Sequence, residues 1–132
     1  MHWLAYVWAA PTSLVGLLCV LCARSSLAFV AGVLEAHGPG IAALFDLLSP
    51  RRAIAAMTLG HVVIARDATT LASTRAHERV HVRQCERWGP CFVPAYLAAS
   101  ALEWLRGSDP YLDNSFEREA WREAPLGDTG LS

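Results

Sequence analysis

The sequence contains no lysine, and its first 23 residues contain no aspartate, glutamate, lysine or arginine. Its 11 basic residues are therefore all arginines, and 12 acidic residues balance them to a formal net charge of −1 at pH 7. The sequence also lacks a basic cluster with interleaved aromatic residues, which is the pattern that indicates a nucleic-acid-binding surface. We therefore expect no nucleic-acid partner.

Charged residues are concentrated in the second half of the chain. Only five of them precede Arg66, and the other 18 lie from Arg66 onward. Hydrophobic residues make up 54% of the chain and the mean hydropathy is +0.30, which is high for a small soluble domain. This distribution predicts that the first half is associated with a lipid bilayer and that the second half faces water.

The uncharged N-terminal segment is long enough to cross a membrane. Residues 3–23, if helical, would extend about 32 Å, which matches the hydrocarbon core of a bilayer. Trp3, Tyr6 and Trp8 lie near one end of this segment, and aromatic side chains favour the membrane interface. We therefore interpret residues 1–24 as a transmembrane anchor.

A cleaved signal peptide is the alternative interpretation of this segment. It is disfavoured because no basic residue precedes the apolar core and no clear small-x-small cleavage site follows it. Arg24, Arg51 and Arg52 all follow the apolar segment, and an excess of arginine marks the cytoplasmic side. The sequence thus predicts a cytoplasmic domain over residues 25–124, followed by a flexible tail over residues 125–132.

Two segments after the anchor have the composition of β-strands. Residues 27–38 are rich in β-branched and aromatic residues and run into Gly-Pro-Gly, and residues 58–64 form a second apolar run. We expect these strands to pair as a small antiparallel sheet, so the predicted fold class is α+β. A second membrane helix over residues 27–48 is disfavoured by Glu35 and by the Gly-Pro-Gly break. The apolar run 41–48 stays unassigned.

The segment His77-Glu78-Arg79-Val80-His81 carries the clearest chemical pattern in the chain. On a helix, residues four apart lie about 40° apart around the axis, so the two histidines share a face and can reach one metal ion. Glu78 lies about 100° round from His77, where its carboxylate can take a proton from a metal-activated water without binding the metal. This HExxH spacing is typical of zinc metallopeptidases, in which the glutamate is the general base.

The flanking residues favour a helix around this motif. Asp67 is a suitable N-cap, and Trp88-Gly89-Pro90 supplies a C-terminal glycine and a following proline. Residues at spacings of four, three and four would form one inward-facing stripe: His77, His81, Gln84 and Trp88. The alternative is a solvated, arginine-rich helix in which the two histidines occur by coincidence.

Two further helices are predicted after the motif helix, over Phe92 to Arg106 and from Asp113-Asn114-Ser115 through Trp121. A catalytic zinc usually has three protein ligands, so the two histidines require a third donor. Glu117 and Glu119 on the last helix are the strongest candidates. About 200° separates them around the helix axis, so we expect only one of them to face the motif helix.

Several alternatives for these roles remain open. Glu117 is also placed to close a capping box with Asn114, which would hold its carboxylate at the end of its own helix. Three residues are weaker candidates for the third ligand: His37, His61 and Cys85. Two tyrosines are weak candidates to hydrogen-bond an oxyanion, although packing roles suit both: Tyr96 and Tyr111.

The four cysteines predict no disulfide framework. Cys19 and Cys22 form a CxxC inside the apolar N-terminal segment, where both are best explained as small hydrophobic residues. Cys85 and Cys91 flank the end of the motif helix. Because the chain shows no secretory signal, we expect both to be free thiols.

The second half of the chain resembles a known pattern. HERVHVRQ with Glu117 on a later helix looks like the gluzincin pattern of HExxH with a downstream glutamate ligand. The chain also resembles small uncharacterised bacterial membrane proteins that share an HExxHxxQ helix, a Trp-Gly-Pro stop and an Asp-Pro-Tyr…Asn…Phe-Glu-Arg-Glu-Ala segment. This likeness covers roughly residues 53–121 and implies a location in the bacterial inner membrane.

The resemblance implies a zincin-like core in which His77, His81 and Glu117 bind Zn²⁺ and Glu78 is the base. Gluzincins often carry an acidic residue four positions after the ligand glutamate. Here that position is Trp121, so another residue such as Asp113 would have to support the site.

The sequence therefore predicts a membrane-anchored zinc-dependent peptidase that acts on a peptide or protein. The alternative is a small subunit of a membrane protein complex, with or without a bound metal and with no hydrolytic role. A third hypothesis is a structural membrane protein in which the motif is coincidental.

Overall fold

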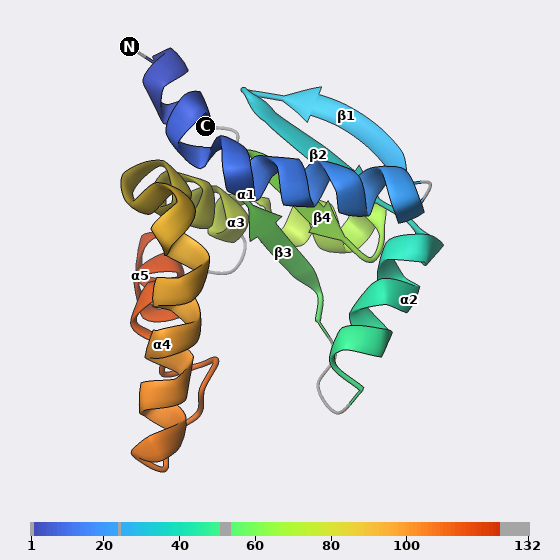
Figure 1. The fold of residues 1–132 in the computed structure, drawn as a ribbon. Coiled ribbons are helices and arrows are strands. Elements are labelled where there is room, and N and C mark those ends of the chain that lie inside the picture. The colour runs from blue at the N-terminus through green and yellow to red at the C-terminus, as the bar shows by residue number, and fades with distance from the viewer. Residues whose placement is uncertain (1, 24, 51–53, 125–132) are drawn as a thin grey trace.

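The computed structural model describes residues 2–23, 25–50 and 54–124. Its elements are, in order, α1 (His2–Ala23), β1 (Ser26–Val30), β2 (Val33–His37), α2 (Pro39–Leu48), β3 (Ala56–Leu59), β4 (Val62–Ala65), α3 (Ala68–Trp88), the 3-10 turn η1 (Gly89–Cys91), α4 (Phe92–Leu105) and α5 (Ser115–Glu123) (Figure 1). The fold is α+β, as predicted. The predicted tail and the three arginines on which the membrane orientation depends lie outside the described residues.

The sheet differs from the predicted antiparallel pair of strands. It has four strands in the order β1-β2-β4-β3, and each of the two predicted strands is in fact a hairpin. The turns lie inside the apolar runs, at Ala31-Gly32 and at Gly60-His61, where positive φ angles reverse the chain. The inner strands β2 and β4 pair in parallel, with Glu35 opposite Val63, because α2 and β3 intervene between them.

The inner strands β2 and β4 are covered on both faces, whereas the edge strand β1 is largely exposed. Val62 and Ile64 of β4 pack in one apolar cluster with Val20 of α1 and Phe45 of α2. The alternate residues of β4 face the other way and pack against the motif helix, in a cluster that contains Val63, Ala65, Leu71 and Val82. All four residues of β4 are buried, so the sheet is a rigid platform on which α3 is held.

Helix α1 crosses the domain and packs against it along much of its length (Figure 1). Ala9, Thr12, Gly16 and Val20 are buried at helical spacing. The Tyr6 hydroxyl donates a hydrogen bond of 2.6 Å to the Gly32 carbonyl, and the Ser13 hydroxyl accepts one of 2.9 Å from the His61 backbone. Residues 3–21 are long and apolar enough to cross a membrane. The helix is thus also part of the folded domain.

Candidate metal centre

Helix α3 has the ends that the sequence predicts. The Asp67 carboxylate accepts a hydrogen bond of 2.7 Å from the Thr70 backbone N–H and caps the helix start. Gly89, with φ of 60°, forms the C-cap, and the Trp8 ring packs so closely on it that a Cβ would not fit. These caps place the HExxH segment in the middle of a 21-residue helix.

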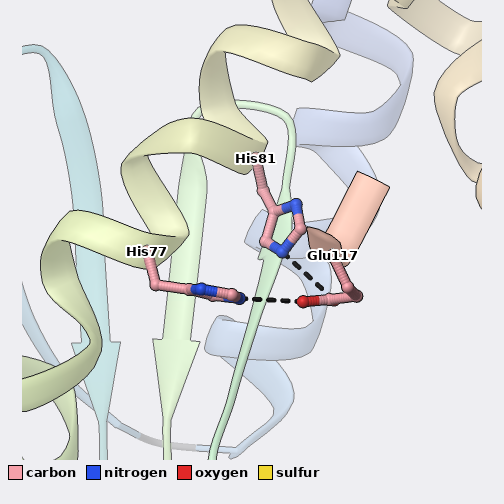
Figure 2. A group of neighbouring side chains, drawn as sticks. All are labelled: His77, His81 and Glu117. Atoms are coloured by element: carbon pink, nitrogen blue, oxygen red, sulfur yellow. Dashed lines mark hydrogen bonds and ion pairs between the residues drawn. The ribbon is translucent and has the colours of Figure 1, made fainter. Parts of the chain in front are cut away.

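The two motif histidines meet Glu117 of α5 in a buried group (Figure 2). Nε2 of His77 lies 2.8 Å from Oε2 of Glu117, and Nε2 of His81 lies 3.1 Å from Oε1. One ligand atom from each residue lies within 4.8 Å of the others. Donors bound to one tetrahedral zinc stand roughly 3.4 Å apart, so small side-chain movements would fit this set to a metal. The group could hold a metal ion.

The charges in this group are strongly coupled. Burial raises the pKa of Glu117, but hydrogen bonds from His77, His81 and Tyr96 outweigh it and lower the pKa to about 2. Burial lowers the pKa of His81, yet the hydrogen bond to Glu117 and the charges of Glu78 and Glu117 raise it to about 9. In the metal-free protein a proton on His81 therefore neutralises Glu117, and a bound cation would replace that proton.

The hydrogen bonds of Asn114 hold the start of α5 in a position from which Glu117 reaches the histidines. Asn114 is fully buried, and its side-chain oxygen caps α5 by accepting a hydrogen bond of 2.9 Å from the Phe116 N–H. Its amide nitrogen donates to the Tyr96 carbonyl and to the Ser100 hydroxyl of α4, at 3.0 and 2.8 Å. Asn114 thus joins α5 to α4. The Glu117 carboxylate points to the histidines, and the capping-box alternative is not what the structure shows.

Glu119 also reaches α3, but at a different residue. Its Oε1 accepts a hydrogen bond of 3.3 Å from Nε2 of Gln84. The expectation that only one of the two glutamates faces the motif helix is therefore wrong, because the two side chains contact α3 at positions one turn apart. Glu117, and not Glu119, belongs to the buried group with the histidines.

The two histidines differ in the partner of their second nitrogen. Nδ1 of His81 lies 2.8 Å from Oε1 of Gln84. Nδ1 of His77 has no hydrogen-bond partner within the described part of the chain, and the Trp121 ring packs against this imidazole with ring centroids 4.2 Å apart. Asp113 does not belong to the buried group, and its carboxylate accepts a hydrogen bond from the Asp109 backbone. The described residues thus give His77 an indole ring as neighbour and no carboxylate partner for its Nδ1.

Glu78 and Tyr96 complete the polar surroundings. The carboxylate of Glu78 is buried and accepts a hydrogen bond of 2.6 Å from the hydroxyl of Thr58 on β3. The hydroxyl of Tyr96 donates one of 2.6 Å to Oε1 of Glu117. Burial raises the pKa of Tyr96, and the Glu117 charge raises it further, so this hydroxyl stays protonated.

These residues open onto a cavity of about 320 Å³. Its polar lining includes Glu78, His81 and Glu117, and its apolar lining includes Ile54, Met57, Leu59, Phe92, Val93 and Leu97. Four consecutive β3 residues, 56–59, line it as well. Because alternate side chains point to opposite faces of a sheet, such a run indicates that the edge of β3 faces the cavity. This is the edge that β4 does not cover.

The weaker candidates for the third ligand do not belong to the buried group. The His61 ring stacks on Tyr6 with centroids 4.0 Å apart, and neither His61 nor His37 belongs to the buried group. Cys85 is buried, which raises the pKa of its thiol to about 12 and makes it a poor ligand. Cys85 and Cys91 are free, as expected, and Cys19 is free as well. The Cys22 side chain lies outside the described residues. Tyr111 lines the cavity.

Sequence reasoning missed the contact of Thr58 with Glu78 and the contacts of Asn114 with α4, although it placed Asn114 at the start of the last helix. A threonine in a short strand and an asparagine before a helix are common, and only the tertiary structure brings them to the site. Gln84 was expected to face inward, but its contact with His81 was not predicted. Its position three residues after His81 is the signal that would have indicated this contact.

In comparisons with known proteins, no family model matched this chain, and neither a curated protein nor a solved structure matched it. Any function of this protein must therefore be inferred from its residues and their geometry.

Proposed function

We propose that this protein is a membrane-associated, zinc-dependent peptidase. The observation that carries the proposal is the buried group of His77, His81 and Glu117, which lies beside Glu78 and opens onto an apolar cavity. Two imidazoles and one carboxylate form a donor set that catalytic zinc sites use, and three protein ligands leave a fourth position open.

A zinc ion bound by these three residues would supply Lewis acidity, polarising a substrate carbonyl and making a water molecule easier to deprotonate. Glu78 lines the same cavity and does not belong to the ligand group. Its carboxylate would take one proton from the attacking water as the water oxygen bonds to the carbonyl carbon. Glu78 would then pass this proton to the amine as the carbon–nitrogen bond breaks.

The shape of the cavity supports a peptide as the substrate. An extended peptide can add to the uncovered edge of β3 through backbone hydrogen bonds, and its alternate side chains then point towards or away from the cavity. Apolar residues on β3 and α4 would bury an apolar side chain of that peptide.

The membrane part of the proposal depends on α1. It is long and apolar enough to span a bilayer, and its outer face exposes large apolar side chains such as Leu14, Leu18 and Leu21. The arginines that follow it in the sequence favour the cytoplasmic side of a bacterial inner membrane for the rest of the chain.

The test begins with metal content. Detergent-purified wild-type protein should contain about one zinc per chain, and the His77→Ala/His81→Ala double variant should contain none. The wild type should then cleave peptides from an apolar-enriched library, while Glu78→Gln should retain zinc and lose cleavage by at least roughly 100-fold.

Each outcome separates the hypotheses. Zinc without cleavage would support the non-catalytic subunit of a membrane complex instead. Absence of metal from the wild type, even after zinc is supplied, would refute the enzyme and leave the motif a coincidence.

A further inference from the structure

We propose that Thr58 is a positioning residue for Glu78: its hydroxyl holds the carboxylate of the general base in its working orientation. This inference rests on the proposed peptidase function and deepens it. It assigns a role to a residue that belongs to neither the HExxH motif nor the ligand group.

The contact is short and shielded from water. Oγ1 of Thr58 lies 2.6 Å from Oε2 of Glu78 and 3.2 Å from the backbone oxygen of the same residue. Only 7% of Thr58 and 5% of Glu78 is exposed. A hydroxyl has one proton, so the nearer carboxylate oxygen receives it. A hydrogen bond from a hydroxyl to a buried carboxylate is among the stronger ones in proteins.

Thr58 is a suitable residue to fix an orientation. Its β-branched side chain has few rotamers, and its strand pairs with the fully buried β4, with Thr58 opposite Val63. The hydroxyl therefore approaches Glu78 from a rigid element. It engages one carboxylate oxygen and leaves the other, Oε1, to accept the proton of the attacking water.

The position of Thr58 on β3 links the base to the substrate. Met57 packs with the cluster on the α1 and α2 side of the sheet, whereas Thr58 faces α3, as the alternation of a strand requires. The backbone of this strand also forms the cavity edge on which a peptide would lie. One strand would thus contact both the substrate backbone and the base on α3, which would hold the two in a fixed relation.

The test compares two substitutions at Thr58. Thr58→Val keeps the branched shape and removes the donor, and Thr58→Ser keeps the donor. We expect Thr58→Val to lower kcat roughly 10- to 100-fold with KM changed less than about threefold. Zinc content should be unchanged, and Thr58→Ser should restore kcat to within about threefold of the wild type.

The matched control is Thr74→Val on α3, where the hydroxyl is part-buried and donates to the Thr70 carbonyl of its own helix. It should retain the wild-type kcat. A Thr58→Val protein with wild-type kcat, or a Thr58→Ser protein as slow as Thr58→Val, would overturn the proposal.

A second measurement needs neither zinc nor activity. In the metal-free protein, a double-mutant cycle of Thr58→Val and Glu78→Ala should show that their effects on the unfolding equilibrium constant are non-additive by roughly tenfold. Additive effects would show that the bond does not hold Glu78, and would overturn the proposal whatever the kinetics. If the effects on the unfolding equilibrium constant are non-additive but Thr58→Val leaves kcat unchanged, Thr58 has a structural role only. A wild type that cleaves no peptide refutes the proposed function itself.

Discussion

Nδ1 of His81 lies 2.8 Å from the side-chain oxygen of Gln84, three residues further along α3. The orientation of this amide is fixed, because its nitrogen donates a hydrogen bond of 3.0 Å to the Phe116 carbonyl. An amide oxygen only accepts, so Nδ1 of His81 must carry a proton. Nε2 is then the nitrogen that can bind a metal, and it is the one that faces Glu117.

This relationship predicts the effect of replacing Gln84. Gln84→Leu keeps the size of the side chain and removes the acceptor, so zinc affinity should fall by about 10- to 100-fold. Gln84→Glu keeps an acceptor for Nδ1 and should bind zinc more tightly than Gln84→Leu. Competition with a chromophoric chelator measures both. Equal affinity for the wild type and Gln84→Leu would show that Gln84 does not orient His81.

The two glutamates of α5 should behave differently. Glu117→Gln replaces a charged donor of the buried group and should weaken zinc binding by roughly 100-fold or more. Glu119→Gln is the matched control, because Glu119 lies on the same helix and contacts Gln84 instead. It should change the affinity by less than about threefold. Isothermal titration of the metal-free proteins with zinc gives both values, and a reversed order would transfer the ligand role to Glu119.

The metal-free protein should show a characteristic dependence of stability on pH. The pKa of His81 is raised from 6.5 to about 9, so its contribution is fully present below pH 6.5 and is lost as the pH rises through 9. The pKa of Glu117 is lowered from 4.5 to about 2, so its contribution is lost as the pH falls from 4.5 through 2. The free energy of unfolding should therefore be greatest between pH 4.5 and 6.5.

Chemical denaturation of the chelator-treated protein at a series of pH values tests this expectation. Between pH 6.5 and 9 the decline should amount to about 3 kcal/mol, and His81→Asn should remove most of it. A flat profile in the wild type would mean that His81 and Glu117 do not interact as the geometry indicates.

A buried ion pair on the far side of α3 predicts a large loss of stability. Glu35 of β2 is 2% exposed and binds Arg75 through two hydrogen bonds of 2.9 and 3.0 Å, and Arg79 through one of 3.2 Å. Glu35→Gln leaves two largely buried guanidinium groups without their counter-charge, so we expect a loss of about 3–5 kcal/mol in the free energy of unfolding.

Asp46→Asn is the matched control for Glu35→Gln, because the Asp46 carboxylate pairs with Arg66 at the surface. It should cost less than about 1 kcal/mol. Denaturant unfolding of the two variants measures both losses in the free energy of unfolding. Losses of similar size would contradict a special role for the buried pair.

The sequence predicted the part of the fold that local chemistry determines. The bounds of α3 were predicted because Asp67 and Gly89 are caps whose effect does not depend on distant residues. The hairpins were missed because Ala31-Gly32 and Gly60-His61 are weak turn signals within apolar runs. The parallel pairing of β2 with β4 depends on where α2 places the chain, which no local pattern shows.

The same division applies to the site. His77, Glu78 and His81 are close in sequence, so helical geometry alone brought them together in the prediction. The need for a third donor left Glu117 and Glu119 as candidates, and the gluzincin resemblance selected Glu117. Its actual position depends on the contacts of Asn114 with α4. The Thr58 hydroxyl meets Glu78 across 20 residues of sequence, a contact that only the packing of the sheet on α3 creates.

The packing of α1 has a practical consequence for any attempt to prepare a soluble form by truncation. Deleting this helix would remove Val20 from the cluster that it forms with Val62 and Ile64. It would also expose the face of the sheet that Gly16 contacts. The remaining chain would therefore expose its own interior and be prone to aggregate, rather than behave as an independent folded domain. Detergent or lipid around an intact chain is the preparation that preserves the site.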